Sequence, residues 1–312
     1  MKKILATLLL LSGYINALPQ TRSFNNPDFN NYSFIGPENW LLREATDHIM
    51  LAQSHTDEPG CIIIIFPLQP SSGDLEKDAQ NIFNQMYSGW QFRSAGERQY
   101  DLSKGYTPQG LEYCMMEAPM SKLSADGSRY DGFEDGAALV IKTGNQIVII
   151  AARHTTMLAH NDCLNKYETW RRFFNGFTVK NATVPKSTEE ENSKRIIGVW
   201  KLTGSGAATG EYIFAANGNY QLAGAIGTSS TTTDYRYEYL HIKTYAFQGD
   251  GSYSISGNQL SFRKRDKNPE QVQFRFEKIN HGDSGWKDRL YLLKTDPTLG
   301  SLYEVCYEKT DR

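Results

Sequence analysis

The sequence predicts a chain in two parts: an α+β domain built on an antiparallel sheet with two helices, followed by an all-β meander barrel. Three observations carry this prediction. Strong helical spacing of apolar residues occurs in the first half only. A charged stretch that contains one proline, residues 183–195, has the composition of a linker. From residue 196 onward, alternating apolar residues and glycine-containing turn pairs replace the helical pattern.

The first residues have the composition of a secretory signal peptide. Two lysines precede an apolar run over residues 4–11, and Ala17 supplies a small residue at the expected cleavage site. The run is too short to span a bilayer as a mature helix. A buried N-terminal helix is the alternative interpretation. We therefore expect a signal peptide over 1–17, a flexible leader over 18–31, and a bacterial protein that is secreted or periplasmic.

Charge and cysteine content narrow the class of protein. The net charge of -2 gives no electrostatic reason to expect nucleic acid as a partner. The protein is expected to be a monomer. After the signal peptide, no apolar run is long enough to form an integral membrane segment. Export permits disulfides, and the candidate pairs are Cys61–Cys114 and Cys61–Cys163. Cys306 is far from these cysteines in the sequence, near the C-terminus. Four buried thiols are the alternative. Because the cysteines lack metal-ligand spacing, neither a metal nor a cofactor is expected.

The first domain is expected over residues 32–182. An isoleucine-rich apolar run over 61–66 predicts a strand buried on both faces. Acidic residues followed by a single apolar stripe predict a helix within 71–90. A Gly-Asn pair between apolar segments predicts a hairpin within 138–151. Aromatic residues at helical spacing predict a second helix over 163–177.

This order of elements has a family resemblance. The segment "FIGPENW" (34–40) lies at the front, a central helix follows, and an aromatic helix closes the domain at "GFTV" (176–179). With these features the first half resembles the PsbP-like fold family. The resemblance implies an α+β sandwich in which each amphipathic helix packs on the sheet. It implies no particular activity, since fold does not determine function.

The second domain is expected over residues 196–312 as an up-and-down barrel. Two hairpins are predicted from tight-turn pairs, Asn217-Gly218 and Gly257-Asn258, each flanked by alternating apolar residues. Further alternation toward the C-terminus brings the expected number of strands to eight or nine. Closure of such a meander removes exposed strand edges.

The first strand of this domain contains Gly198 and Trp200 in a G-x-W pattern. A G-x-W at the start of a small meander barrel resembles the lipocalin or calycin superfamily. The resemblance implies that Trp200 lies across the closed end of the barrel and that Gly198 lets the backbone bend there. The stacking arginine of that family has no clear match, because Arg289 starts a strand and Arg312 ends the chain. A surface tryptophan on an ordinary sandwich strand is the alternative.

One segment of the predicted barrel is rich in tyrosine, and its candidate ligand-binding residues share one strand face. They are Tyr235, Tyr237, Tyr239, His241 and Tyr245. Tyrosine combines apolar area with a polar tip, so such a stripe suits a pocket for an amphipathic ligand. The alternative is that these tyrosines only cover a sheet, where they have good strand propensity.

Taken together, the sequence predicts an exported, non-enzymatic binding protein that holds a small apolar or amphipathic ligand in the C-terminal barrel or contacts an envelope protein. A structural or protein-interaction module with a packed, ligand-free barrel is the alternative. A hydrolase with a loop-built site is a third hypothesis, although no catalytic residue is nominated. His154, His160 and Asp162 match no metal motif and are interpreted as a solvated loop. A packed barrel interior would argue against small-molecule binding there.

Overall fold

The computed structural model describes most of the chain. The described residues are 24–34, 36, 40–53, 61–92, 100–124, 126, 130–155, 173–182, 188–203, 208–234, 237–264, 268–280, 285–295 and 302–310. The protein is mostly β-structure and contains a closed antiparallel barrel, as the sequence predicts for its second half. Among the described residues, no helix is both long enough and apolar enough to cross a bilayer.

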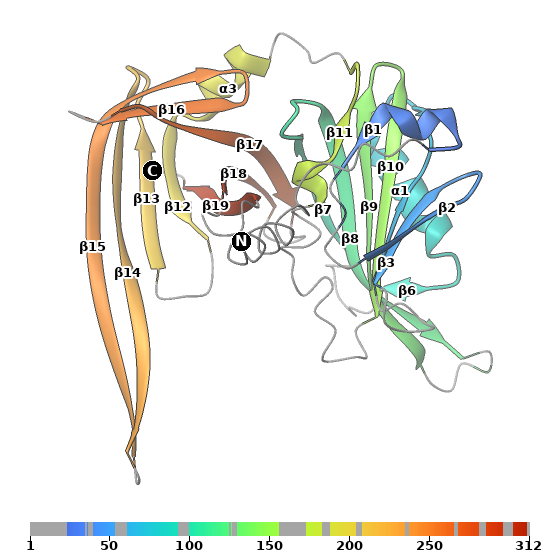
Figure 1. Cartoon of the computed structure of the whole chain (residues 1–312), viewed down its shortest axis with the longest axis horizontal. Helices are drawn as coiled ribbons and strands as arrows, with labels where there is room; N and C mark the ends of the chain where they lie inside the picture. Colours follow the sequence, from blue (N-terminus) through green and yellow to red (C-terminus); the bar gives the residue numbers. More distant parts are fainter. Residues whose placement is uncertain are drawn as a thin grey trace, which may run out of the picture.

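The first half of the chain forms a large antiparallel sheet (Figure 1). Its strands lie side by side in the order β2 (Trp40–Glu44), β3 (Ile49–Gln53), β4 (Cys61–Ile65), β10 (Gln146–Thr155), β9 (Tyr130–Thr143), β8 (Glu112–Leu123) and β7 (Asp101–Tyr106). Short β5 (Gln69–Pro70) pairs with β10, and short β6 (Gln91–Phe92) pairs with β8. β1 (Tyr32–Ser33) and β11 (Thr178–Val179) form a separate two-stranded sheet.

Helix α1 (Leu75–Met86) covers one face of this sheet and lies within the segment where a helix is predicted. Its N-terminus is capped by Asp74, whose carboxylate accepts hydrogen bonds from the backbone N–H groups of Glu76 and Lys77. The helix buries Ala79 and Phe83 against the side chains of β8 and β9. Burial of this single apolar stripe fixes α1 on the sheet.

The opposite face of the sheet is covered by aromatic side chains. The 3₁₀-helix η1 (Pro27–Asn31) contributes Phe29, and the chain around β11 contributes Phe173, Phe174 and Phe177. These rings pack on Ile63 and Ile65 of β4 and on the valine and isoleucine side chains of β10. The other face of β4 is only partly buried at Ile62 and Ile64, so the strand is fully buried on one face and not on both as predicted. Of the predicted second helix, residues 173–176 are helical, and 163–172 lie outside the described residues.

The second half closes into a barrel of eight strands among the described residues. They are β12 (Gly198–Leu202), β13 (Ala208–Phe214), β14 (Asn219–Asp234), β15 (Tyr237–Ser256), β16 (Gln259–Lys264), β17 (Glu270–Asn280), β18 (Trp286–Thr295) and β19 (Leu302–Thr310). Each strand pairs with the next in the chain, and β19 returns to β12. The predicted turns are present, with positive φ at Gly218 and Gly257.

Two strands of the barrel are much longer than the rest. β14 pairs with β13 only as far as Ile226, and β15 pairs with β16 only from Gly251. Among the described residues, 227–234 and 237–244 therefore pair only with each other. This two-stranded ribbon projects well beyond the other strands of the barrel (Figure 1).

The two halves are joined by backbone hydrogen bonds. The first part of β17 pairs with β16, and its last part pairs with β7 of the N-terminal sheet, so that the sheet continues into the barrel wall. Helix α3 (Thr188–Arg195) forms the end of the segment predicted as a linker, 183–195. Residues 183–187 lie outside the described residues. The division into 32–182 and 196–312 stays a prediction, but the two segments share one sheet.

The cysteines are of two kinds. Cys61 is disulfide-bonded, whereas Cys114 and Cys306 are free thiols. The Cys61–Cys114 pairing and the alternative of four free thiols are therefore both wrong. Cys163, the other candidate partner, lies outside the described residues.

Candidate functional site

Trp200 lies inside the barrel and is fully buried, which excludes the surface tryptophan considered above. Its ring centroid is 5.6 Å from that of Phe276, and its Nε1–H donates a hydrogen bond to the Ile196 carbonyl at 2.6 Å. Gly198 begins β12 with a φ of 132°, a conformation that L side chains rarely adopt. The role of Gly198 and Trp200 in closing one end of the barrel stays a prediction.

The described part of the barrel interior is filled by aromatic side chains. Ring centroids lie 4.9 Å apart for Tyr220 and Phe262, 5.2 Å for Tyr212 and Tyr307, and 5.0 Å for Phe214 and Tyr253. These are ordinary contact distances for packed aromatic pairs. Where these rings meet, the barrel has a core rather than a cavity.

Only the backbone of the predicted tyrosine stripe is described, and Tyr235 lies outside the described residues altogether. Tyr237, Tyr239 and His241 lie on the projecting ribbon, beyond the last residue that β14 pairs with β13. Tyr245 pairs with Ile226 at the border between ribbon and barrel. Whether these side chains contact a ligand stays a prediction. His154 lies within β10 and pairs with Cys61 and Asp135, so its interpretation as part of a loop is wrong. His160 and Asp162 are outside the described residues.

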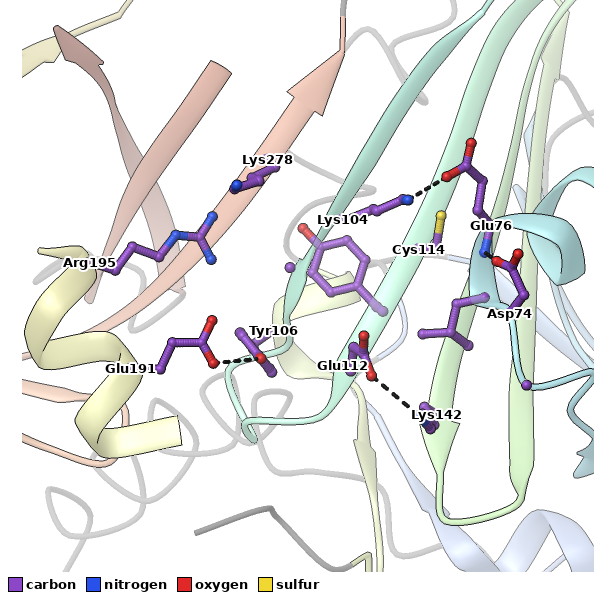
Figure 2. A pocket seen from close by; sticks show the side chains of 14 residues that line it. Asp74, Glu76, Lys104, Tyr106, Glu112, Cys114, Lys142, Glu191, Arg195 and Lys278 are labelled. Carbon is purple, nitrogen blue, oxygen red and sulfur yellow. Dashed lines mark hydrogen bonds and ion pairs between the residues drawn. The ribbon is translucent and has the colours of Figure 1, made fainter. Parts of the chain in front are cut away.

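A polar cavity of about 510 Å³ lies where the two halves meet, and we call it the junction cleft. Its floor is the continuous sheet β9–β8–β7–β17, which supplies Lys142, Glu112, Lys104 and Lys278. The N-terminus of α1 forms one wall, and α3 forms the opposite wall with Glu191 and Arg195 (Figure 2).

Most cations of the junction cleft are paired. Lys104 forms an ion pair with Glu76. Burial alone would lower the pKa of Lys104, but the hydrogen bond and charge of Glu76 outweigh burial, so the pKa of Lys104 is raised. The Arg195 guanidinium contacts Asp288 at 2.9 Å and lies 5.0 Å above the Phe276 ring, where it covers the barrel core.

Lys278 is the exception among the cations of the cleft. It is exposed and lies between Lys104 of β7 and Asp288 of β18 in the strand register. Both of these neighbours have ion-pair partners of their own, since Lys104 pairs with Glu76 and Asp288 with Arg195. No ion-pair partner of Lys278 lies within the part of the chain that the structure describes. The ammonium group of Lys278 is therefore available to pair with an anionic group of a ligand.

Two further groups in the cleft bear on its chemistry. The Tyr106 hydroxyl donates to Glu191 at 3.1 Å; burial and this carboxylate raise the pKa of Tyr106 to about 12. The Cys114 thiol is buried, and burial raises its pKa to about 12 as well. Both groups therefore stay protonated at neutral pH. A protonated, inaccessible thiol is a poor nucleophile, so Cys114 does not nominate a covalent mechanism.

Among the charged residues of this cleft, the sequence pointed only to Asp74 and Glu76, as the acidic start of the predicted helix. A usable signal was present for α3, because Glu191 and Arg195 are four residues apart and share one helical face. Lys104 and Tyr106 likewise share one strand face. What the sequence lacked was any sign that these segments meet.

Comparisons with known proteins place few constraints on this chain. No protein-family model matches it, and no curated protein matches it. Among solved structures, a mutant form of protein Mog1 is similar over 51% of this chain and 93% of its own length, with 13% identity and a TM-score of 0.33. The Saccharomyces cerevisiae Ran-binding protein Mog1p is similar over 49% and 93%, with 11% identity and a TM-score of 0.34.

A protein of Bacteroides thetaiotaomicron is similar over 53% of this chain and 54% of its own length, with 9% identity and a TM-score of 0.28. Likenesses this weak support no argument about fold or function. The junction cleft therefore has to be interpreted from its own chemistry. It combines fixed charges of both signs with hydroxyl groups. Among the described residues no group of three potential ligands is arranged to hold a metal ion.

Proposed function

We propose that this chain is an exported, non-enzymatic binding protein whose ligand occupies the junction cleft and not the barrel interior. The observation that carries the proposal is the contrast between the two spaces. The described barrel interior is filled by packed aromatic rings, whereas the cleft is open, charged and about 510 Å³ in volume. Pockets of about 300–1,000 Å³ accommodate small ligands.

The charges of the cleft favour a ligand with an anionic group. Lys278 offers an ammonium group without a described ion-pair partner on the floor, and the Arg195 guanidinium faces the same space from α3 (Figure 2). On the wall, Glu191 accepts a hydrogen bond from Tyr106 and keeps further acceptor capacity. A ligand that carries a negative group and also hydrogen-bond donors therefore matches the cleft best.

Two features support export. Residues 1–17 have the composition of a signal peptide, and Cys61 is disulfide-bonded, which is typical of oxidising compartments. The finer fold assignments, a PsbP-like α+β domain for the first half and a lipocalin-like family for the barrel, also remain proposals. They rest on the sequence segments and the G-x-W pattern given above.

A protein-interaction module without a small ligand is the second candidate. The projecting β14–β15 ribbon favours it, because within the described part of the chain residues 227–234 and 237–244 pair only with each other and extend away from the barrel. A partner would then contact the ribbon, with the packed barrel as its support. The two candidates differ in the surface at which a charge-reversing substitution weakens binding. That surface is the junction cleft for a small ligand and the ribbon for a protein partner.

The test measures ligand binding to the mature chain by calorimetry and thermal shift. The probes are small dicarboxylates, inorganic phosphate and acidic amino acids, with a fatty acid as the apolar probe. We expect an anionic probe to bind and Lys278→Glu to weaken it at least tenfold. The control is Lys201→Glu, which makes the same change in net charge at an exposed lysine of β12 and is expected to leave binding unchanged. Binding of the fatty acid alone, or of no probe, contradicts the proposal.

A further inference from the structure

A second cavity borders the junction cleft. It has a volume of about 550 Å³ and is lined by the β9–β10 turn, the segment after β11 and parts of the N-terminal sheet. Glu112 and Lys142 line both cavities. Their ion pair, with Lys142 Nζ and Glu112 Oε2 at 3.5 Å, is therefore the boundary between the two spaces.

This boundary is weak. The side chains of Lys142 and Glu112 are 43% and 52% exposed, and ion pairs at such positions contribute little to stability. Both side chains are long and flexible, so they can turn aside or bind a ligand's own polar groups. A ligand can thus extend from one cavity into the other.

The two cavities have different chemistry. The junction cleft carries charged groups, of which Lys278 lacks a described ion-pair partner. The second cavity is lined by the apolar side chains of Leu68, Leu111 and Val179, together with amide groups such as that of Asn181. Asn181 has a φ of 59°, the left-handed conformation that asparagine tolerates in turns.

We propose that the two cavities form one groove and that its ligand is an extended peptide with an acidic residue in the junction cleft and an apolar side chain in the second cavity. This inference rests on the proposed function and names its ligand class. A peptide supplies negative charge, apolar side chains and backbone donors along one chain. A neutral oligosaccharide would cover the charged groups without compensating their lost hydration.

The test uses N-acetylated, C-amidated hexapeptides in which glutamate and leucine are separated by zero to three residues. Fluorescence anisotropy with the full mature chain measures their affinity, and N-acetylglutamate amide serves as the small anionic probe. We expect the best hexapeptide to bind at least tenfold more tightly than the small probe. Replacing its glutamate with lysine abolishes this gain.

Two variants separate the cavities. Thr143→Trp fills the second cavity and is expected to weaken the hexapeptide at least fivefold while the small probe binds as before. Unchanged binding of the small probe also shows that this variant folds. Lys278→Glu weakens both ligands.

The outcomes separate the two proposals. If the small probe binds through Lys278 and no hexapeptide binds more tightly, the groove inference is overturned and the proposed function stands. If neither binds, both are overturned. If a neutral oligosaccharide binds and Thr143→Trp blocks it, the peptide assignment is overturned. Loss of the small probe in Thr143→Trp overturns the division into two cavities.

Discussion

Gly105 of β7 lies directly opposite Glu277 of β17, in the hydrogen-bonded seam that joins the N-terminal sheet to the barrel. A Cβ atom at Gly105 would lie 2.3 Å from the carbonyl oxygen of Phe276 and 3.1 Å from the Cα of Glu277. Both atoms belong to the backbone, which cannot turn aside as a side chain can. The close approach of the two halves therefore depends on the missing side chain at this position.

Gly105→Ala is predicted to destabilise the protein by about 1–3 kcal/mol, the usual range for overpacking. The reason is that β7 and β17 must separate to admit the methyl group. Urea denaturation measures the change in the free energy of unfolding. Gly210→Ala is the matched control, since its Cβ would meet Leu202 at an ordinary 3.6 Å. Equal stability of Gly105→Ala and wild type would contradict the seam.

A buried ionic network lies beside this seam. The Arg275 side chain has no exposed area and contacts Glu277 at 2.8 Å and Glu304 at 2.6 Å. From the N-terminal half, the Tyr113 hydroxyl donates to Glu277, and the Asn175 amide donates to Glu304. The ion pairs themselves lie within the barrel half, whereas the hydrogen bonds from Tyr113 and Asn175 form only while the two halves are in contact.

Arg275→Ala is predicted to cost about 3–5 kcal/mol, because it leaves two buried carboxylates without their guanidinium. The measurement is again the free energy of unfolding. Lys287→Ala is the control, since the Lys287–Glu308 pair is partly exposed and is expected to contribute less than about 1 kcal/mol. Similar losses of stability in the two variants would mean that the Arg275 network contributes no more to the free energy of unfolding than a partly exposed ion pair does.

Alternation along the second half was enough to predict a closed meander and its tight turns, because apolar residues recur at every second position of many of its strands. The same alternation misleads at β17. Arg275 and Glu277 occupy positions that a strand pattern assigns to solvent, yet they are buried under the N-terminal half. Periodicity shows which face of a strand is apolar. It does not show whether another part of the chain covers the polar face.

The junction cleft escaped prediction for the same reason. Lys104 and Lys278 are far apart in sequence, and only the pairing of β7 with β17 brings them to opposite register positions. The charged run around Glu191 has the composition of a linker, yet it forms helix α3. Composition alone does not show the spacing of residues along a helix, so the helix was missed. Sites between two halves of a chain depend on contacts that no single segment encodes.

Trp200→Phe is predicted to destabilise the barrel by about 1–3 kcal/mol. The smaller ring leaves a void in the aromatic core and removes the hydrogen bond to the Ile196 carbonyl. Trp286→Phe is the control, because Trp286 is 45% exposed. Thermal unfolding followed by circular dichroism compares them. A larger loss in Trp286→Phe would show that Trp200 does not support the core.

Cleavage between the halves is predicted to leave them associated. A specific protease site introduced at residues 184–186 would cut the chain within the charged segment. Because the fragments share the β7–β17 seam and the Arg275 network, we expect them to co-elute in size-exclusion chromatography at neutral pH. Combining the cut with Gly105→Ala is expected to promote separation. Fragments that separate without any further change would support independent domains.

Cys114 is predicted to make the protein less stable in alkaline solution. Burial raises the pKa of its thiol from 9.0 to about 12. Between these values the unfolded chain releases the thiol proton and the folded chain keeps it, so the free energy of unfolding falls as pH rises. For one group the slope approaches about 1.4 kcal/mol per pH unit.

Urea denaturation of wild type and Cys114→Ala at pH 8 to 10.5 isolates this contribution, since Cys306 and the buried tyrosines are present in both proteins. We expect the wild-type stability to fall more steeply above pH 9. Parallel pH profiles would mean that the Cys114 thiol ionises as easily in the folded chain as in the unfolded one.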